Sequence, residues 1–343
     1  MAVEPFTGFR PFPTHHCVTG SMRHVYQLMG RDVSEELLLG LGAGVGFVYW
    51  HQKGQPPFFG GRANVGRKGE EGLERLAGRR TGVAVAQHIT SSSRKAEAAL
   101  SAQLSAGEPA MLQVDMGLLP YFDFPEEYHF GGHVVAVVGY DERQRTVLIC
   151  DRDTTLHPVC LEALAAARGS TFKPFPPRHG SWTFDFAGQR DPRPDEVRDA
   201  IREAASAMLE PPIRNLGVAG VRKAATLIGR WPSTLGAETL AAACSNGYFM
   251  IDSAGGTGGG MFRYMYARFL EEAAEIAGDA GLRRGGAGLR AAGDRWQEVA
   301  TLFDKAWREG DPAGPLEQIP PLLRAIADVE EAAWRDLLTA ART

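Results

Sequence analysis

The sequence predicts an α+β protein, with a mixed N-terminal domain over residues 1–190 and an all-α C-terminal domain over residues 191–343. Two observations carry this prediction. The stretch 131–151 has two apolar runs separated by a polar turn, which is the pattern of an antiparallel β-hairpin. From residue 194 onward, alanine and leucine recur at helical spacing and strand patterns are missing.

The amino-acid composition limits the classes of function that the protein can have. The 343 residues are 44% hydrophobic and 23% charged, as in a globular protein that buries a core without disulfides. With a net charge of −4 and no basic stripe, we expect neither nucleic acid nor a membrane surface as a partner. No signal peptide or bilayer-spanning run is visible. The four cysteines lack metal-ligand spacing, so we expect reduced thiols, no metal site and a cytoplasmic protein.

The first expected elements are two helices, one from Cys17 to Met29 and one starting near Asp32 or Ser34. The glycine run 40–46 lies between a helix and a strand, the reverse of a nucleotide-binding loop, which favours close backbone packing. The polar stretch 51–82, with Arg67 and Lys68, is expected to be a surface loop or to hold an anionic group at the mouth of a site.

Alternating helix and strand patterns follow. A helix over 94–105, a buried strand over 110–115 and an aromatic loop over 121–125 precede the hairpin, and a short helix over 161–167 and a strand over 181–186 follow it. The six helices expected in the C-terminal domain span 196–209, 218–228, 238–243, 262–277, 289–309 and 321–341.

A cysteine at the start of a helix is the first candidate for chemistry. Cys17 opens the first expected helix, where unpaired backbone N–H groups carry partial positive charge and favour a thiolate. The thiolate is the reactive form of cysteine. A lone cysteine is more often a small core residue, so its reactivity has to be supported by other parts of the chain.

The hairpin supplies two partners for such a cysteine. With the turn centred near Arg143, a regular hairpin places His133 opposite residue 153 and one diagonal away from residue 151. A carboxylate beside a histidine fixes its tautomer and stabilises the imidazolium. Asp151 is the first choice for this role and Asp153 a close second. A helix-start cysteine, a strand histidine and a carboxylate on the next strand form the arrangement of papain-like thiol enzymes.

Three stretches carry a resemblance to a known family: His16–Ser21, Ser34–Gly44 and Gly132–Tyr140. They resemble the N-terminal domain of butirosin biosynthesis protein H, a family that resembles papain-like cysteine peptidases in fold. The helical remainder, including 212–216 and 258–263, resembles the domain of unknown function that often follows it. The resemblance implies an acyltransferase that moves an acyl or aminoacyl group from an acyl-carrier-protein thioester to an amine.

Roles for individual residues follow from that resemblance. Cys17 is expected to be acylated, His133 to act as base and then acid, and Asp151 to orient His133. The backbone N–H of Cys17 is the natural oxyanion donor. Further candidates for substrate binding or assistance are His16, Thr19, Tyr49 and Asp153, with a turn role equally open for His16. No cofactor is expected, because the phosphopantetheine thioester arrives on the carrier protein.

Two alternatives use the same residues differently. In a cysteine peptidase or amidase, water replaces the amine, and exclusion of water decides between hydrolysis and transfer. In a non-catalytic scaffold, Cys17 is buried. The expected partners of the transferase are an acyl carrier protein and a small-molecule amine in natural-product biosynthesis. The helical domain is expected either to cap the site or to mediate a homodimer.

Overall fold

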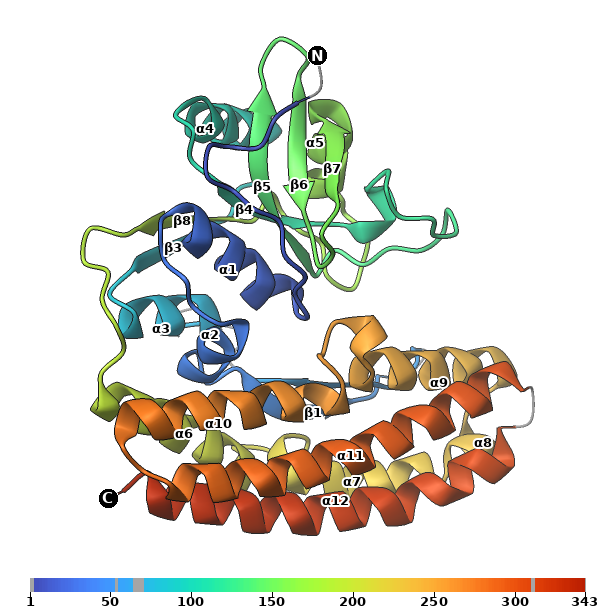
Figure 1. Ribbon diagram of the computed structural model, residues 1–343. Helices are drawn as coiled ribbons and strands as arrows, with labels where there is room; N and C mark the ends of the chain where they lie inside the picture. Colours follow the sequence, from blue (N-terminus) through green and yellow to red (C-terminus); the bar gives the residue numbers. More distant parts are fainter. Residues whose placement is uncertain (1–2, 53–54, 64–70, 310–311, 343) are drawn as a thin grey trace. The chain divides into compact units, whose positions relative to one another are not determined.

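The computed structural model describes residues 3–52, 55–63, 71–309 and 312–342 (Figure 1). The chain forms two compact units. We call Met1–Leu38 with Gly82–Arg190 the sheet unit, and Leu39–Thr81 with Asp191–Thr343 the helical unit. The surface loop expected over 51–82 is wrong in part, because residues 58–62 form a strand and residues 73–80 a helix. The stretch 64–70, which contains Arg67 and Lys68, lies outside the described residues, so the expected anion-holding role there stays a prediction.

The sheet unit is built on a six-stranded antiparallel sheet with strand order β3-β8-β4-β5-β6-β7. The strands are β3 (Ala84–His88), β4 (Ala110–Val114), β5 (His133–Asp141), β6 (Thr146–Cys150), β7 (Leu156–Cys160) and β8 (Ser181–Asp185). The predicted hairpin is confirmed as β5 and β6. The prediction missed β7 because Pro158 interrupts its pattern, and a proline is tolerated there because β7 is an edge strand.

Helices cover both faces of this sheet. Along β5, the side chains of Val135 and Val137 belong to a core with α4 (Ser93–Ser105) and α5 (Leu161–Gly169). Ala136 and Val138 point to the opposite face, which α1 (Cys17–Leu28) covers. The strict alternation of side chains along a strand therefore separates the helix that carries Cys17 from α4 and α5.

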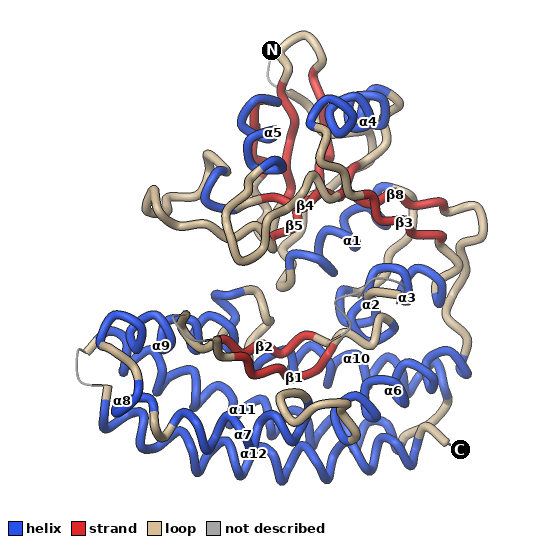
Figure 2. The backbone as a smooth tube through the Cα atoms, turned by 180° about the vertical axis from the view of Figure 1, so that it is seen from behind, coloured by secondary structure: helices blue, strands red, loops and turns tan. Residues whose placement is uncertain are grey.

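The helical unit combines most of the helices with a small hairpin (Figure 2). Its elements are β1 (Val45–Trp50), β2 (Phe58–Arg62), α3 (Leu73–Arg80), α6 (Pro194–Leu209), α7 (Gly217–Ile228), α8 (Trp231–Thr234), α9 (Ala237–Ile251), α10 (Arg263–Ala277), α11 (Gly281–Arg308) and α12 (Ala313–Ala340). β1 and β2 pair with each other and pack against α7 and α9. The predicted α+β class with a helical C-terminal part is confirmed.

The division of the chain differs from the predicted single break at residue 190. The chain does change units there, but it also changes units inside α2 (Glu35–Leu41), so that residues 39–81 pack with the helices. A buried ion pair helps to explain why residues 39–81 pack with the C-terminal helices. The guanidinium of Arg263 donates to both carboxylate oxygens of Glu330, at 2.8 and 2.9 Å, and also to the backbone carbonyl of Gly46. The backbone carbonyl of Gly46 on β1 thereby accepts a hydrogen bond from a guanidinium that the helices bury, which lowers the cost of burying that charge.

The expected close packing at the glycine run is confirmed at Gly40. A Cβ atom there would lie 2.2 Å from the ring of Phe269 on α10, so only glycine fits. The predicted start of α12, at residue 321, is too late, because the two adjacent prolines were expected to mark the beginning of the helix. The helix instead begins at Ala313 and runs through two prolines.

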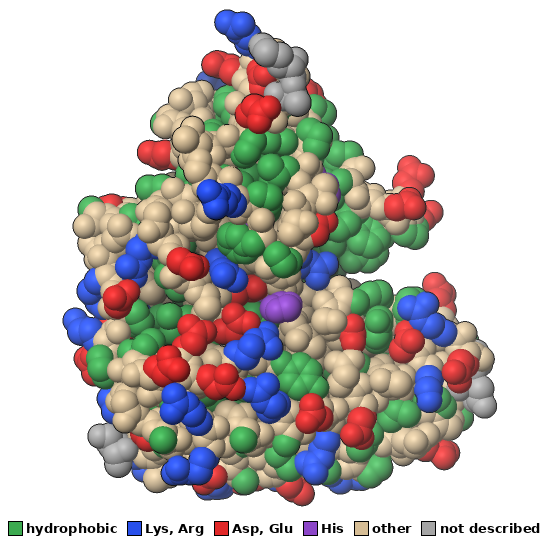
Figure 3. Space-filling model, in the orientation of Figure 1, with side chains coloured by type: hydrophobic (Ala, Val, Ile, Leu, Met, Phe, Trp, Pro, Cys, Tyr) green, Lys and Arg blue, Asp and Glu red, His purple; other side chains and the backbone are tan. Residues whose placement is uncertain are grey.

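Charges on the visible face of the helical unit are interspersed in sign (Figure 3). Arg222 on α7 pairs with Asp328 and Glu331 of α12, and Arg335 also pairs with Glu331. Exposed pairs of this kind contribute little stability, roughly 0–1 kcal/mol each. None of the helices in the described part of the chain is both long and apolar enough to cross a membrane.

Candidate functional site

Cys17 is the first residue of α1 and its side chain is partly exposed. His16 is the N-cap, and its ring accepts from the backbone N–H of Thr19. One turn later, the hydroxyl of Ser21 donates to the carbonyl of Val134, which fixes the helix against β5. The prediction that Cys17 opens a helix is confirmed, and its thiol lies at the positive end of the helix dipole.

A buried carboxylate, which sequence reasoning treated only as a helix-start residue, supports the loop before Cys17. Glu35 accepts the backbone N–H of His15 at 2.8 Å and of His16 at 2.6 Å. It also accepts the hydroxyl of Thr19 at 3.0 Å. Burial raises the pKa of Glu35, and these hydrogen bonds oppose that rise. The structure therefore places His16 and Thr19 in a buried network that shapes the loop.

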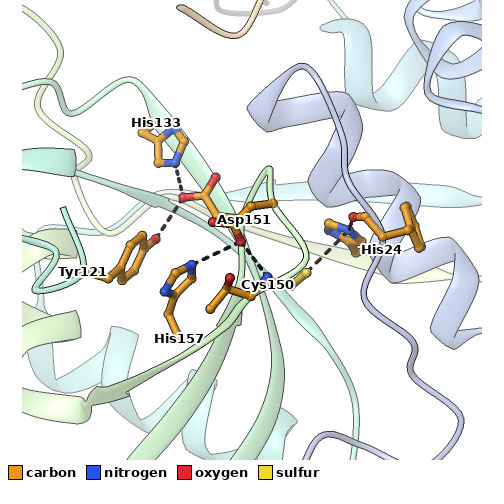
Figure 4. Close-up of polar contacts among 9 residues, drawn as sticks. His24, Tyr121, His133, Cys150, Asp151 and His157 are labelled. Atoms are coloured by element: carbon orange, nitrogen blue, oxygen red, sulfur yellow. Dashed lines mark hydrogen bonds and ion pairs between the residues drawn. The ribbon is translucent and has the colours of Figure 1, made fainter. Parts of the chain in front are cut away.

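His133 is the first residue of β5 and is almost fully buried. Its Nε2 lies 2.8 Å from Oδ2 of Asp151 (Figure 4). Its side chain also hydrogen-bonds to Cys17. Because Nε2 is engaged by Asp151, the ring nitrogen that remains for Cys17 is Nδ1. The three residues predicted to carry the chemistry are thus joined in one chain of contacts.

The place where β6 ends, and not its register, decides which aspartate contacts His133, because the register continued past Cys150 would put residue 153 opposite His133. Ala136 pairs with Cys150, and β6 ends there, so Asp151 directly follows the strand. Asp153 is exposed and instead contacts His157 and the backbone N–H of Thr155. Of the two candidates left open by the sequence, the structure brings Asp151 to His133 and not Asp153.

Tyr121 is a second partner of Asp151 that the sequence did not single out. Its hydroxyl donates to Oδ2 at 2.9 Å, the same oxygen that faces His133. In Figure 4 the two rings point at this oxygen from neighbouring elements. The phenol ring stacks on His157, with ring centroids 4.0 Å apart. The other oxygen of Asp151 is buried and has no hydrogen-bond partner within the described chain. The only sequence signal for Tyr121 was its place in an aromatic loop.

The charges of this site stabilise one another. Burial alone would lower the pKa of His133, but the negative charge of Asp151 and the hydrogen bonds to Asp151 and Cys17 raise it to about 10. Burial would raise the pKa of Asp151, but the charge of His133 and the hydrogen bonds from His133 and Tyr121 lower it. An imidazolium beside a thiol favours the thiolate, so the arrangement can provide a nucleophile at neutral pH.

The other cysteines have different surroundings. Burial raises the pKa of Cys150 to about 12 and that of Cys244 to about 11, so both thiols stay protonated at neutral pH. Cys150 lies 3.5 Å from Nε2 of His24, whose pKa burial lowers to about 4. His24 therefore stays neutral. Cys160 is exposed at the end of β7.

Tyr49, a further candidate, belongs to the helical unit, whereas Cys17, His133 and Asp151 belong to the sheet unit. It lies on β1 of the helical unit, where it is almost fully buried and its hydroxyl accepts from the indole of Trp231 at 3.3 Å. These contacts make it a core residue of that unit. Within the described ranges, no group of three or more His, Cys, Asp or Glu side chains is arranged to hold a metal ion.

Comparison with known families matches two parts of the chain. Residues 16–152 match the family described as butirosin biosynthesis protein H, N-terminal, and this range contains Cys17, His133 and Asp151. Residues 162–337, just over half of the chain, match a domain of unknown function, DUF4872. A comparison with curated proteins gives no match. The chain therefore belongs to the family in which a butirosin biosynthesis protein H N-terminal domain is followed by a DUF4872 domain.

Proposed function

We propose that the protein is a cysteine-dependent acyltransferase with a papain-like arrangement of catalytic residues. It moves an acyl or aminoacyl group from an acyl-carrier-protein thioester to an amine in natural-product biosynthesis. The observation that carries the proposal is the contact chain from the partly exposed Cys17 through His133 to Asp151. The family description, which names a protein of butirosin biosynthesis, supports a role in antibiotic-type chemistry.

The reaction divides into two transfers. The Cys17 thiolate attacks the thioester carbonyl, the bond from that carbon to the carrier sulfur breaks, and the departing thiolate takes a proton from the His133 imidazolium. The amine then attacks the acyl-Cys17 carbonyl and gives a proton to His133. The amide forms and Cys17 leaves as the thiolate. A thiolate is the leaving group in both transfers, the carrier thiolate in the first and that of Cys17 in the second. The covalent intermediate therefore replaces one difficult step with two easier ones.

The remaining groups have supporting roles. Asp151 holds His133 and stabilises its charged form, and the backbone N–H of Cys17 at the start of α1 donates to the oxyanion. Glu35 fixes the two residues before Cys17 through their backbone N–H groups. The protein needs no cofactor of its own in this scheme, because phosphopantetheine belongs to the carrier-protein substrate.

A papain-like peptidase or amidase is the alternative within the same chemistry, with water in place of the amine. Intact-mass measurement separates the two. The protein is mixed with a candidate carrier protein bearing an acyl group, and the acyl adduct is then followed with and without an amine. We expect an adduct in the native protein and in the Cys160→Ser control, none in Cys17→Ala, and discharge that is faster with amine than with water. Discharge by water at a rate that no amine increases would favour the hydrolase.

Thiol labelling tests the scaffold alternative. In a Cys160→Ser background, which removes the exposed cysteine, Cys17 should react with iodoacetamide at pH 7 well before Cys150 and Cys244. His133→Ala should slow the labelling of Cys17. Labelling of Cys17 that is as slow as that of the two buried thiols would contradict a catalytic role.

A further inference from the structure

A small pocket opens between α4 and α5, on the sheet face opposite α1 and away from the residues used by the proposed transfer. Its walls come from both helices and from the loop before β8. Apolar side chains such as Leu100 and Leu164 form one part of the lining, and the polar side chains are Ser93, Glu97, Arg168 and His179. The cavity volume is about 30 Å³, and one ordered water needs roughly 10–15 Å³.

The unusual group in this pocket is the guanidinium of Arg168, near the end of α5. Arg168 is only 3% exposed. It donates one weak hydrogen bond, at 3.3 Å, to the carbonyl of Ala96, and its Nε has no partner. No carboxylate among the residues that the structure describes forms an ion pair with it. Burial without a counter-charge lowers the pKa of Arg168 to about 10. A buried cation of this kind is costly unless an anion is present.

Two further polar side chains line the same space and hydrogen-bond to each other. Nε2 of His179 lies 3.2 Å from the hydroxyl of Ser93, the first residue of α4. His179 and Arg178 both have a φ of +52°, a conformation that non-glycine residues rarely adopt. The strain is offset in part because the backbone N–H of His179 donates to the carbonyl of Arg168. The loop thus holds an imidazole beside the guanidinium at a cost in backbone energy, as is common at functional sites.

One acidic side chain also lines the pocket, but its charge is engaged elsewhere. The carboxylate of Glu97 lies 3.2 Å from the guanidinium of Arg145 on the exposed side of α4. Arg145 also pairs with Glu162. The charge that faces the enclosed part of the pocket is therefore that of Arg168.

We propose that this pocket binds a tetrahedral oxyanion of the sulfate or phosphate class. Arg168 supplies the charge, His179 and Ser93 supply further polar contacts, and α4 begins at Ser93 in the lining of the pocket. The size of the pocket limits the ligand to a group of a few heavy atoms. Free inorganic anions and the phosphate group of a small phosphomonoester share this chemistry, and experiment distinguishes them.

The test is thermal unfolding of the full chain in sodium sulfate, sodium phosphate or β-glycerophosphate, each compared with sodium chloride at equal ionic strength. We expect sulfate and phosphate to raise the unfolding midpoint saturably, by roughly 2–4 °C, since a ligand that binds the native state stabilises it. An equal rise with β-glycerophosphate would assign the pocket to phosphomonoesters, and a rise confined to sulfate and phosphate would assign it to free anions. A midpoint that is the same in sulfate, phosphate, β-glycerophosphate and chloride would overturn the proposal.

Variants locate the effect. Arg168→Gln should remove the anion-dependent rise, whereas Arg10→Gln, which deletes an exposed positive charge elsewhere in the sheet unit, should keep it. His179→Gln and Ser93→Ala should each weaken sulfate binding at least ~3-fold in titration calorimetry, as expected for loss of a hydrogen bond to a charged ligand. These two variants decide the question if Arg168→Gln does not fold. An anion effect of native size in both of them, or in a folded Arg168→Gln, would refute the site.

Discussion

Nε2 of His133 lies 2.8 Å from Oδ2 of Asp151, and both side chains are at most 5% exposed. At this distance and in this surrounding, the carboxylate favours the charged imidazole far more than it would in water. In the proposed mechanism, the proton that Cys17 gives up therefore has a stable acceptor. This pair connects the fold to the proposed chemistry, because β5 supplies the histidine and the end of β6 supplies the aspartate.

Asp151→Asn should remove most of the thiolate character of Cys17 at neutral pH. An amide carries no charge to stabilise the imidazolium, so the pKa of His133 should fall towards its ordinary value. We expect acyl transfer at pH 7 to drop by about 10²–10⁴-fold, the range for loss of general acid–base catalysis. Thiolate absorbance at 240 nm, followed against pH in a Cys160→Ser background, should show Cys17 ionising at higher pH than in the native protein.

Asp153→Asn is the matched control for that variant. Asp153 is exposed and contacts His157 rather than His133. Its replacement should leave both the transfer rate and the thiolate titration close to those of the native protein. If Asp153→Asn lowered activity as strongly as Asp151→Asn, the assignment of Asp151 as the orienting residue would be wrong.

Tyr121→Phe should lower the rate of acyl transfer without abolishing it. The ring that stacks on His157 stays, and only the hydroxyl that donates to Oδ2 of Asp151 is lost. Hydrogen bonds to charged groups contribute about 1.5–3 kcal/mol, so we expect a rate loss of roughly 10-fold or more. The hydroxyl helps to lower the pKa of Asp151, so the acidic limb of the pH–rate profile should move to higher pH.

Tyr140→Phe is the control, since Tyr140 lies on β5 at the far end from His133. A Tyr121→Phe enzyme with an unchanged pH–rate profile would mean that the phenol does not act through Asp151. A lower unfolding midpoint with a native pH profile would assign Tyr121 a purely structural role.

The sequence predicted those parts of the site that depend on short-range patterns. Cys17 at a helix start and His133 at a strand start follow from apolar spacing, and the hairpin turn limited the carboxylate to Asp151 or Asp153. The choice between the two depends on the residue at which β6 ends. A sequence pattern locates the end of a strand only to within a residue or two, so it could not decide. A register change in β5, between Val137 and Gly139, is also invisible to alternation alone.

Contacts between distant segments could not be predicted in this way. Glu35 lies 19 residues from His16 and Tyr121 lies 30 residues from Asp151. Gly46 and Arg263 are 217 residues apart, and their hydrogen bond helps to assign residues 39–81 to the helical unit. Periodicity reports which face of an element is buried, and it does not report which other element covers that face.

Glu35→Gln should destabilise the loop before Cys17. The amide keeps one acceptor oxygen but loses the charge and the second acceptor, so at least one of the backbone N–H groups of His15 and His16 loses its partner. A buried donor without a partner costs about 1–3 kcal/mol, and denaturant unfolding should show a loss of that size. Asp32→Asn, at a nearby exposed carboxylate, should change stability by less than ~0.5 kcal/mol. Equal stability of Glu35→Gln and the native protein would show that Glu35 does not hold this loop.

The raised pKa of His133 also predicts how stability depends on pH. The pKa is about 10 in the folded protein and 6.5 for an ordinary histidine, so the folded state holds this proton more tightly than the unfolded state does. The stabilisation is therefore fully present below pH 6.5 and is lost as the pH rises through about 10. We expect the difference in unfolding free energy between the native protein and His133→Gln to be constant near pH 6 and to shrink steadily up to pH 10. Titrating groups remote from His133 are common to both proteins and cancel in this difference, and a Cys17→Ala background removes the thiol whose ionisation depends on His133. A difference that stayed flat or grew over the same range would mean that His133 is neutral in the folded protein, and Cys17 would then lack the charged neighbour on which its proposed reactivity depends.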